Sequence, residues 1–195
     1  MDVFSKAGAG ISMLIDVTKL LYNGITVWPG DTPFERVTRE TGDFTSSKVT
    51  MSLHTGTHMD APRHRFKDGK PVDEIFPFIV PALVKTSGDP AGKAVLFDRA
   101  VTAAEAEELV KGGMVLIGTS SISIDHGEQT EAHAIILGAG IPVIENLELA
   151  EVMPGEYIVM AFPLKIAGAD GSPVRVLLAE TPEDIFSFKH GSNND

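Results

Sequence analysis

Apolar and polar residues alternate strictly between Lys48 and Leu53, in the sequence KVTMSL. A period of two residues is typical of a β-strand that buries one face and exposes the other. The pattern therefore predicts a half-buried strand over this segment. The strand is followed directly by residues 54–64, HTGTHMDAPRH. The backbone conformation of this segment decides in which direction its side chains point.

The chain before this strand is predicted to consist of short strands and loops. Short strands are predicted at Ile11–Val17 and around Val27, and Asn23-Gly24 between them is a strong turn signal. The segment Val27–Phe34 reads VWPGDTPF, and its two prolines and glycine predict an irregular loop.

The second half of the chain alternates helical and strand patterns. Thr102–Lys111 is the clearest helix, because Thr102 and Glu105 have the spacing of a capping box and Gly112-Gly113 follows as a stop signal. A second helix is predicted at Thr130–Leu137. Further strands are predicted at Met114–Thr119, Ile141–Ile144, Tyr157–Pro163 and Val174–Leu178. The pattern predicts an α/β fold with a mixed sheet.

Length and composition predict one globular domain, since the chain has 195 residues, of which 43% are hydrophobic and 22% charged. The longest apolar runs are far shorter than the ~20 residues that a membrane-spanning helix needs. The first residues, MDVFSKAGAG, lack a signal-peptide pattern, so a cytoplasmic location is expected. We expect a flexible arm over residues 1–10, the domain over 11–185 and a disordered tail over 186–195.

Charge and the lack of cysteine limit the partners. A net charge of −11 with no basic run makes nucleic acid and anionic membranes poor partners, so a small molecule is expected instead. No cysteine is present, so disulfides and thiolate chemistry are excluded and a metal would have to be held by nitrogen and oxygen ligands.

Half of the six histidines lie between His54 and His64, together with one aspartate. If the backbone stays extended beyond the alternating strand, His54, Gly56, His58 and Asp60 all point to the same face. The glycine would then leave a vacancy where an ion could sit between imidazoles and carboxylate. Two nitrogens and one oxygen with open positions are typical of a catalytic zinc or manganese site.

His64 follows Pro62, which should end the strand, so it need not be a metal ligand. An imidazole beside a metal-bound water could take a proton from that water and deliver it to a leaving nitrogen. The metal would polarise a carbonyl and supply the hydroxide, so the pattern indicates hydrolysis of an amide or an ester.

Other residues carry weaker signals. His133 on the second helix and Glu145 at a strand end are ordinary structural residues unless the site needs more ligands, as a binuclear one would. Trp28 is equally well explained as a loop anchor or as an aromatic wall for a flat substrate. Asp125 is ambiguous, and His126 is interpreted as a loop residue.

The segment HTGTHMDAPRH resembles the H-x-G-x-H-x-D-x-P-x-H signature of the metal-dependent cyclase superfamily. That superfamily includes bacterial kynurenine formamidases (arylformamidases) and isatin hydrolases. VWPGDTPF resembles the loop that precedes the signature in the formamidases. Three later segments resemble the C-terminal half of the superfamily in the same order: LIGTSSISID, ENLELAEVMPGEY and FPLKIAGADGSPVRVLL. The likeness covers the chain from about Ile15 to Leu178.

The resemblance implies a swivelling β/β/α-type sandwich that assembles as a homodimer or homotetramer. It implies one or two Zn²⁺ ions, or Mn²⁺, and a proton shuttle at His64. It also implies that Trp28 contacts the substrate. The implied metal ligands are His54, His58, Asp60, His133 and Glu145, with Asp60 bridging two metals.

The activity that the resemblance implies is arylformamidase activity, the hydrolysis of N-formylkynurenine to kynurenine and formate in tryptophan breakdown. Phe78–Leu116 is shorter than expected of a kynurenine formamidase, and ISIDHG is closer to isatin-hydrolase-like members, so the substrate loops can differ. Hydrolysis of a cyclic amide such as isatin is therefore a second hypothesis. A third is a metal-binding scaffold or sensor without turnover.

Overall fold

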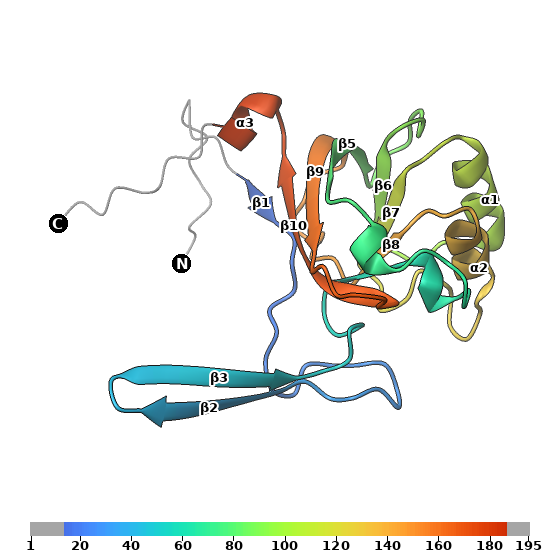
Figure 1. The fold of residues 1–195 in the computed structure, drawn as a ribbon. Helices are drawn as coiled ribbons and strands as arrows, with labels where there is room; N and C mark the ends of the chain where they lie inside the picture. The colour runs from blue at the N-terminus through green and yellow to red at the C-terminus, as the bar shows by residue number, and fades with distance from the viewer. Residues whose placement is uncertain (1–13, 187–195) are drawn as a thin grey trace.

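The computed structural model describes residues 14–186, and Figure 1 shows their arrangement. The strands within this range are β1 (Ile15–Asp16), β2 (Glu35–Thr41), β3 (Phe44–Thr50), β4 (His58–Asp60), β5 (Phe78–Val84), β6 (Ala94–Phe97), β7 (Leu116–Thr119), β8 (Val143–Glu145), β9 (Gly155–Pro163) and β10 (Gly171–Ala179). The helices are α1 (Ala103–Lys111), α2 (Glu131–Gly138), α3 (Pro182–Phe186) and the 3₁₀ turns η1 (Pro62–His64) and η2 (Val72–Glu74).

The main sheet is mixed and closes on itself. Its strand order is β1-β10-β4-β8-β7-β6-β5-β9, and β9 also pairs with β10. Seven strands therefore form a closed barrel, with β1 attached outside it on β10. The β5-β6-β7-β8 pairs are parallel and the other pairs are antiparallel. The predicted α/β class with a mixed sheet is confirmed, and the closure into a barrel is what the structure adds.

The alternation of strand side chains produces two apolar cores. In β6, Leu96 belongs to the core inside the barrel, whereas Val95 belongs to the core under the helices. The same division separates Leu116 from Ile117 in β7. A strand that is buried on both faces has a continuous run of apolar residues in its sequence. The strand predicted at Met114–Thr119 was recognisable for this reason.

The two longer helices lie together on one side of the barrel, over β6 and β7 in Figure 1. Helix α1 begins as predicted, because Thr102 Oγ1 accepts the Glu105 N–H and the Glu105 carboxylate accepts the Thr102 N–H. None of the helices between residues 14 and 186 combines the length and the apolar character that crossing a membrane requires.

The strand predicted over residues 48–53 is only partly present, and its half-buried character is wrong. Strand β3 ends at Thr50, and every residue of β2 and β3 is exposed. The two strands pair only with each other in the order β2-β3, as a hairpin that projects from the barrel in Figure 1. Alternation identified the extended backbone here, but among the described residues nothing buries either face of the hairpin.

Other elements also differ from prediction. The strand around Val27 is absent, and the loop Val27–Phe34 is present as predicted. The prediction missed β5, which contains Pro81 at its centre, and the short β6; a proline inside a run argues against a strand. The predicted arm at 1–10 and residues 187–195 of the predicted tail lie outside the described residues.

Candidate metal centre

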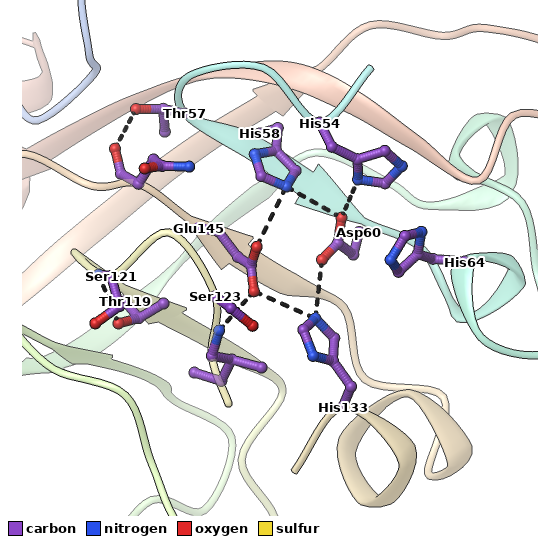
Figure 2. Close-up of polar contacts among 12 residues, drawn as sticks. His54, Thr57, His58, Asp60, His64, Thr119, Ser121, Ser123, His133 and Glu145 are labelled. Carbon is purple, nitrogen blue, oxygen red and sulfur yellow. Dashed lines mark hydrogen bonds and ion pairs between the residues drawn. The ribbon is translucent and has the colours of Figure 1, made fainter. Parts of the chain in front are cut away.

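Strand β4 presents His58 and Asp60 on one face and Met59 on the other. All three residues are buried, and Met59 packs in the core inside the barrel. Because alternate residues of a strand share a face, the imidazole and the carboxylate lie together, with His58 Nε2 3.3 Å from Asp60 Oδ1. This pair forms the centre of the group of side chains in Figure 2.

The extended backbone predicted from His54 onward is wrong before β4. Residues 53–57 form turns and bends, and Gly56 has a φ of 64°. A Cβ at Gly56 would lie 2.5 Å from Leu21 Cδ2. The glycine therefore permits a left-handed turn packed against Leu21, and the predicted vacancy for an ion beside Gly56 is wrong.

His54 and His64 reach the same place from opposite ends of β4. His54 lies in the loop before the strand, with its Nδ1 2.6 Å from Asp60 Oδ1. His64 is the last residue of η1, which begins at Pro62 directly after the strand. Their ring centroids are 4.2 Å apart. The fold thus brings together the histidines of the motif without a continuous strand.

Glu145 and His133 join this group from β8 and α2. Glu145 is the register partner of His58 across the β4–β8 pair, and its Oε2 lies 3.5 Å from His58 Nε2. His133 is in the first turn of α2, with its Nε2 3.2 Å from Glu145 Oε1. The two residues with weak sequence signals therefore lie beside the motif.

Asp60 lies between the imidazoles. Its Oδ1 faces His54 and His58, and its Oδ2 lies 3.3 Å from His133 Nε2. The Asp60 side chain is only 1% exposed. A carboxylate with its two oxygens turned to different histidines has the geometry of a bridge between two ligand groups (Figure 2).

Hydrogen bonds at the outer ring nitrogens orient two of the histidines. The Gly56 carbonyl lies 2.9 Å from His58 Nδ1, and Asp125 Oδ2 lies 2.5 Å from His133 Nδ1. Both partners are acceptors, so in the neutral rings Nδ1 carries the hydrogen and Nε2 offers a lone pair. Those lone pairs face the carboxylate oxygens of Asp60 and Glu145, which are also acceptors. A cation between them would satisfy both sets.

The pKa shifts of the histidines and of Asp60 also indicate that the cluster favours a positive charge. Burial lowers the pKa of His58, but Asp60 and Glu145 outweigh it and raise the pKa to about 10. Burial also lowers the pKa of His133, yet Asp125, Asp60 and Glu145 raise it to about 12. Burial would raise the pKa of Asp60, but His58, His133 and His54 hold it well below its usual range. The cluster favours positive charge between its carboxylates.

Among residues 14–186, two groups of three side chains have ligand atoms within 4.8 Å of one another: His58, Asp60 and Glu145, and His54, Asp60 and His64. Asp60 is common to both. His133 is in neither group, although its Nε2 faces Asp60 and Glu145. Imidazole nitrogens and carboxylate oxygens are ligands that suit Zn²⁺ or Mn²⁺, so the donor set fits a divalent metal.

Trp28 lines the cavity that contains these side chains. The cavity has a volume of about 270 Å³, and its wall includes Ile122, Arg65 and Gln129 as well as the histidines. Trp28 is 44% exposed, so its ring is not part of the core. This position fits an aromatic wall better than a loop anchor.

Sequence reasoning left Asp125 ambiguous and missed Asp170, two carboxylates that contact the outer nitrogens of the histidines. Asp125 accepts the Ala132 N–H at 2.7 Å as well as contacting the His133 ring, so it orients α2 and His133 together. Its position shortly before a predicted helix was the available signal. Asp170 lies 3.1 Å from His54 Nε2, and nothing in its local sequence indicates this contact. His126, as predicted, is an exposed loop residue.

The chain matches known proteins over most of its length. The model of the Cyclase family matches residues 15–151. Kynurenine formamidase from Bacillus cytotoxicus is 36% identical over an alignment that covers 84% of this chain and 96% of that protein. The kynurenine formamidase from Geobacillus thermodenitrificans is 35% identical, with the same coverage of both chains.

Solved structures share the fold. A protein described as a "predicted metal-dependent hydrolase" from Bacillus stearothermophilus superposes with a TM-score of 0.74 at 28% identity, covering 87% of this chain and 98% of that one. Isatin hydrolase A from Labrenzia aggregata superposes with a TM-score of 0.75 at 23% identity, covering 87% and 94%. Because the family model matches residues 15–151 and the kynurenine formamidases are 35–36% identical over most of the chain, the chain belongs to the cyclase family.

Proposed function

We propose that this protein is a metal-dependent amidohydrolase that releases formate from an N-formyl arylamine such as N-formylkynurenine. The observation that carries the proposal is the convergence of His54, His58, His133, Asp60 and Glu145 in one cavity, with His64 beside them and Trp28 on its wall. The kynurenine formamidases that match most of the chain support this choice of substrate.

The proposed metal ligands are His54, His58, Asp60, His133 and Glu145. They would hold one or two Zn²⁺ or Mn²⁺ ions, with Asp60 bridging in the second case because its oxygens face different histidines. A bound divalent metal supplies Lewis-acid activation of water and of the amide carbonyl. The sheet holds His58, Asp60 and Glu145 in place, because β4 lies between β8 and β10.

His64 is the proposed proton carrier. Its side chain is 37% exposed, whereas the proposed ligands are mostly buried, so it lies at the open side of the cluster. In the proposed reaction His64 takes a proton from the attacking water and gives it to the amine nitrogen as the C–N bond breaks. The water oxygen remains in the formate, and the free arylamine leaves.

Trp28 is the proposed contact for the aromatic part of the substrate. An arylamide is flat, and an indole ring can stack against it while the formyl group points to the metal ligands. The cavity of about 270 Å³ admits a small molecule of this kind. Replacing Trp28 with Ala should therefore raise KM more than it lowers kcat.

The decisive experiment combines elemental analysis with an assay. Protein purified without chelator should contain one or two divalent metal ions per chain, and formate release from N-formylkynurenine should stop when a chelator removes them. Bound metal without formate release would overturn the formamidase assignment, and hydrolysis of isatin would then identify a cyclic-amide hydrolase. No metal after reconstitution with Zn²⁺ or Mn²⁺ would overturn the mechanism.

The His64→Ala variant distinguishes an enzyme from a metal-binding scaffold or sensor without turnover. A scaffold would retain every measurable property in this variant, whereas the enzyme would lose activity and keep its metal.

We further propose that the protein works in the cytoplasm as a homodimer or homotetramer. The β2–β3 hairpin supports an oligomer, because two strands alone bury too little surface to be stable in water and the barrel does not pair with them. Light scattering coupled to gel filtration tests the assembly, and a monomer at micromolar concentration would contradict it.

A further inference from the structure

Each proposed histidine ligand of the cluster has a partner for the ring nitrogen that faces away from Asp60. For His58 this partner is the Gly56 carbonyl, and for His133 it is Asp125. We propose that Asp170 is the equivalent partner of His54 and a positioning residue for both His54 and His64. The proposal rests on the function proposed for these two histidines, and it extends that function to a carboxylate outside the motif.

The backbone around Asp170 is fixed although the residue lies in a loop. Its carbonyl accepts the Ala61 N–H at 2.9 Å, directly after β4. The preceding residue, Ala169, accepts the Val72 N–H at 2.9 Å. The following residue, Gly171, begins β10 and is the register partner of Asp60. Asp170 is thus held beside the cluster by hydrogen bonds on both sides.

The side chain of Asp170 contacts two imidazoles with one oxygen. Oδ2 lies 3.1 Å from His54 Nε2 and 3.5 Å from His64 Nδ1. If His54 is neutral, donation from Nε2 to Asp170 leaves the lone pair of Nδ1 facing Asp60, 2.6 Å away. A carboxylate on the outer nitrogen of a ligating histidine fixes its tautomer and ring orientation. Asp170 therefore selects Nδ1 of His54 as the inner nitrogen, whereas His58 and His133 present Nε2.

Gly171 confirms how tightly this edge of the barrel encloses His54. A Cβ at Gly171 would lie 2.7 Å from His54 Cε1 and 3.0 Å from the Met59 carbonyl. The missing side chain lets the backbone of β10 lie close to the imidazole, which occupies the space that a Cβ at residue 171 would need. The contacts of Nδ1 with Asp60 and of Nε2 with Asp170 orient the ring within this space.

His64 depends on the same carboxylate. Its contact with Asp170 is longer than that of His54, and the His64 ring is more exposed. With Nδ1 turned to Asp170, Nε2 is the nitrogen left to accept and release a proton. Loss of the Asp170 carboxylate should therefore affect metal binding through His54 and proton transfer through His64.

The first test reads the ring nitrogens directly. In the zinc-loaded protein labelled with ¹⁵N-histidine, the chemical shifts should show Nδ1 as the inner nitrogen of His54 and Nε2 as that of His58 and His133. In the Asp170→Asn variant the His54 pattern should change while the His133 pattern stays. Identical His54 shifts in the two proteins would overturn the proposal.

The second test measures zinc affinity by competition with a chromophoric chelator, together with steady-state kinetics. Asp170→Asn should weaken zinc binding about 10- to 100-fold, the usual range for a lost partner of a ligating histidine. It should lower kcat more than it changes KM. Asp170→Glu, which keeps the charge, should recover part of both effects.

Asp73→Asn is the matched control. Asp73 is another carboxylate that contacts this loop, since its Oδ1 accepts the Gly168 N–H at 2.9 Å. Equal loss of zinc affinity in the two Asn variants would mean that Asp170 acts only through loop structure, and would overturn the proposal. Wild-type protein that binds zinc but releases no formate would contradict the proposed function alone, because the zinc affinity and the ¹⁵N shifts still test Asp170.

Discussion

Strands β3 and β4 are neighbours in the chain and opposites in the fold. Every residue of β3 is exposed on the hairpin, whereas every residue of β4 is buried. Apolar Phe44 in β3 is 80% exposed, and the charged residue Asp60 in β4 is 1% exposed. The polarity of a residue therefore does not tell which of the two strands enters the barrel.

The difference comes from the number of neighbours that each strand has. Strand β4 pairs with β10 and β8, and its polar side chains face histidines and carboxylates from other elements. Strand β3 pairs with β2 alone. A buried charge is tolerated only where paired groups replace water, and β4 lies where the fold supplies them. The barrel should therefore be sensitive to substitution and the hairpin tolerant of it.

The largest effect is expected for Asp60→Asn. Asp60 contacts His54, His58 and His133, so the variant removes the charge that the proposed metal needs. Activity should fall about 1,000-fold or more, since the metal contributes several kcal/mol and each 1.36 kcal/mol is tenfold in rate. Elemental analysis and formate release measure the two losses. If the variant keeps its full metal content and normal activity, Asp60 is not a metal ligand.

His64→Ala comes next. A proton carrier contributes about 10²- to 10⁴-fold, so kcat should fall by that factor while the metal content stays unchanged. Elemental analysis separates this role from another one that the geometry allows, because His64 also belongs to a possible ligand group with His54 and Asp60. Loss of metal in the variant would show that His64 is a metal ligand and would contradict its role as a proton carrier alone.

Met59→Ala tests the other face of β4. Met59 is fully buried inside the barrel, and truncating it should lower the free energy of unfolding by about 2–5 kcal/mol. Urea denaturation of the metal-loaded protein gives the value. A loss below about 1 kcal/mol would mean that the core inside the barrel collapses into the space left by the Met59 side chain.

Thr102→Ala should cost about 1 kcal/mol of stability, because the Thr102 side chain accepts the Glu105 N–H at the start of α1. Thermal unfolding of the variant beside the wild type measures this loss. An unchanged melting temperature would contradict the contribution of the cap.

The Glu105→Gln variant tests how the stability contributed by the start of α1 depends on pH. Hydrogen bonds from Arg99 and from Thr102 lower the pKa of Glu105 from 4.5 to about 2. A lowered folded-state pKa adds stability above the unfolded value that is lost as the pH falls from about 4.5 toward 2. The stability difference between wild type and Glu105→Gln should therefore shrink over this range. A difference that is constant between pH 7 and pH 3 would contradict it.

The smallest effect is expected for Phe44→Ser in the hairpin. Phe44 is exposed at the start of β3, so its replacement should change the free energy of unfolding by at most about 0.5 kcal/mol. A much larger loss in urea denaturation would show that the hairpin is covered in the assembled protein, and the contrast with β4 would then be smaller than the single chain suggests.

The sequence by itself determined the elements that have local causes. Helix α1 follows from the capping box at Thr102 and the glycines after Lys111, and β7 follows from a continuous apolar run. The spacing of His54, His58, Asp60 and His64 indicated one metal-binding cluster, because no ordinary fold requirement gathers such residues. These signals depend on neighbours within a few residues, which a single sequence contains.

Only the tertiary structure decided how distant residues meet. Glu145 faces His58 because β8 pairs with β4, and Asp170 reaches His54 because β10 pairs on the other side. Gly56 has a positive φ and lies against Leu21, a residue more than thirty positions earlier in the chain. Strand pairing between segments about a hundred residues apart has no local pattern, so burial and the partners of each histidine follow from the closure of the barrel.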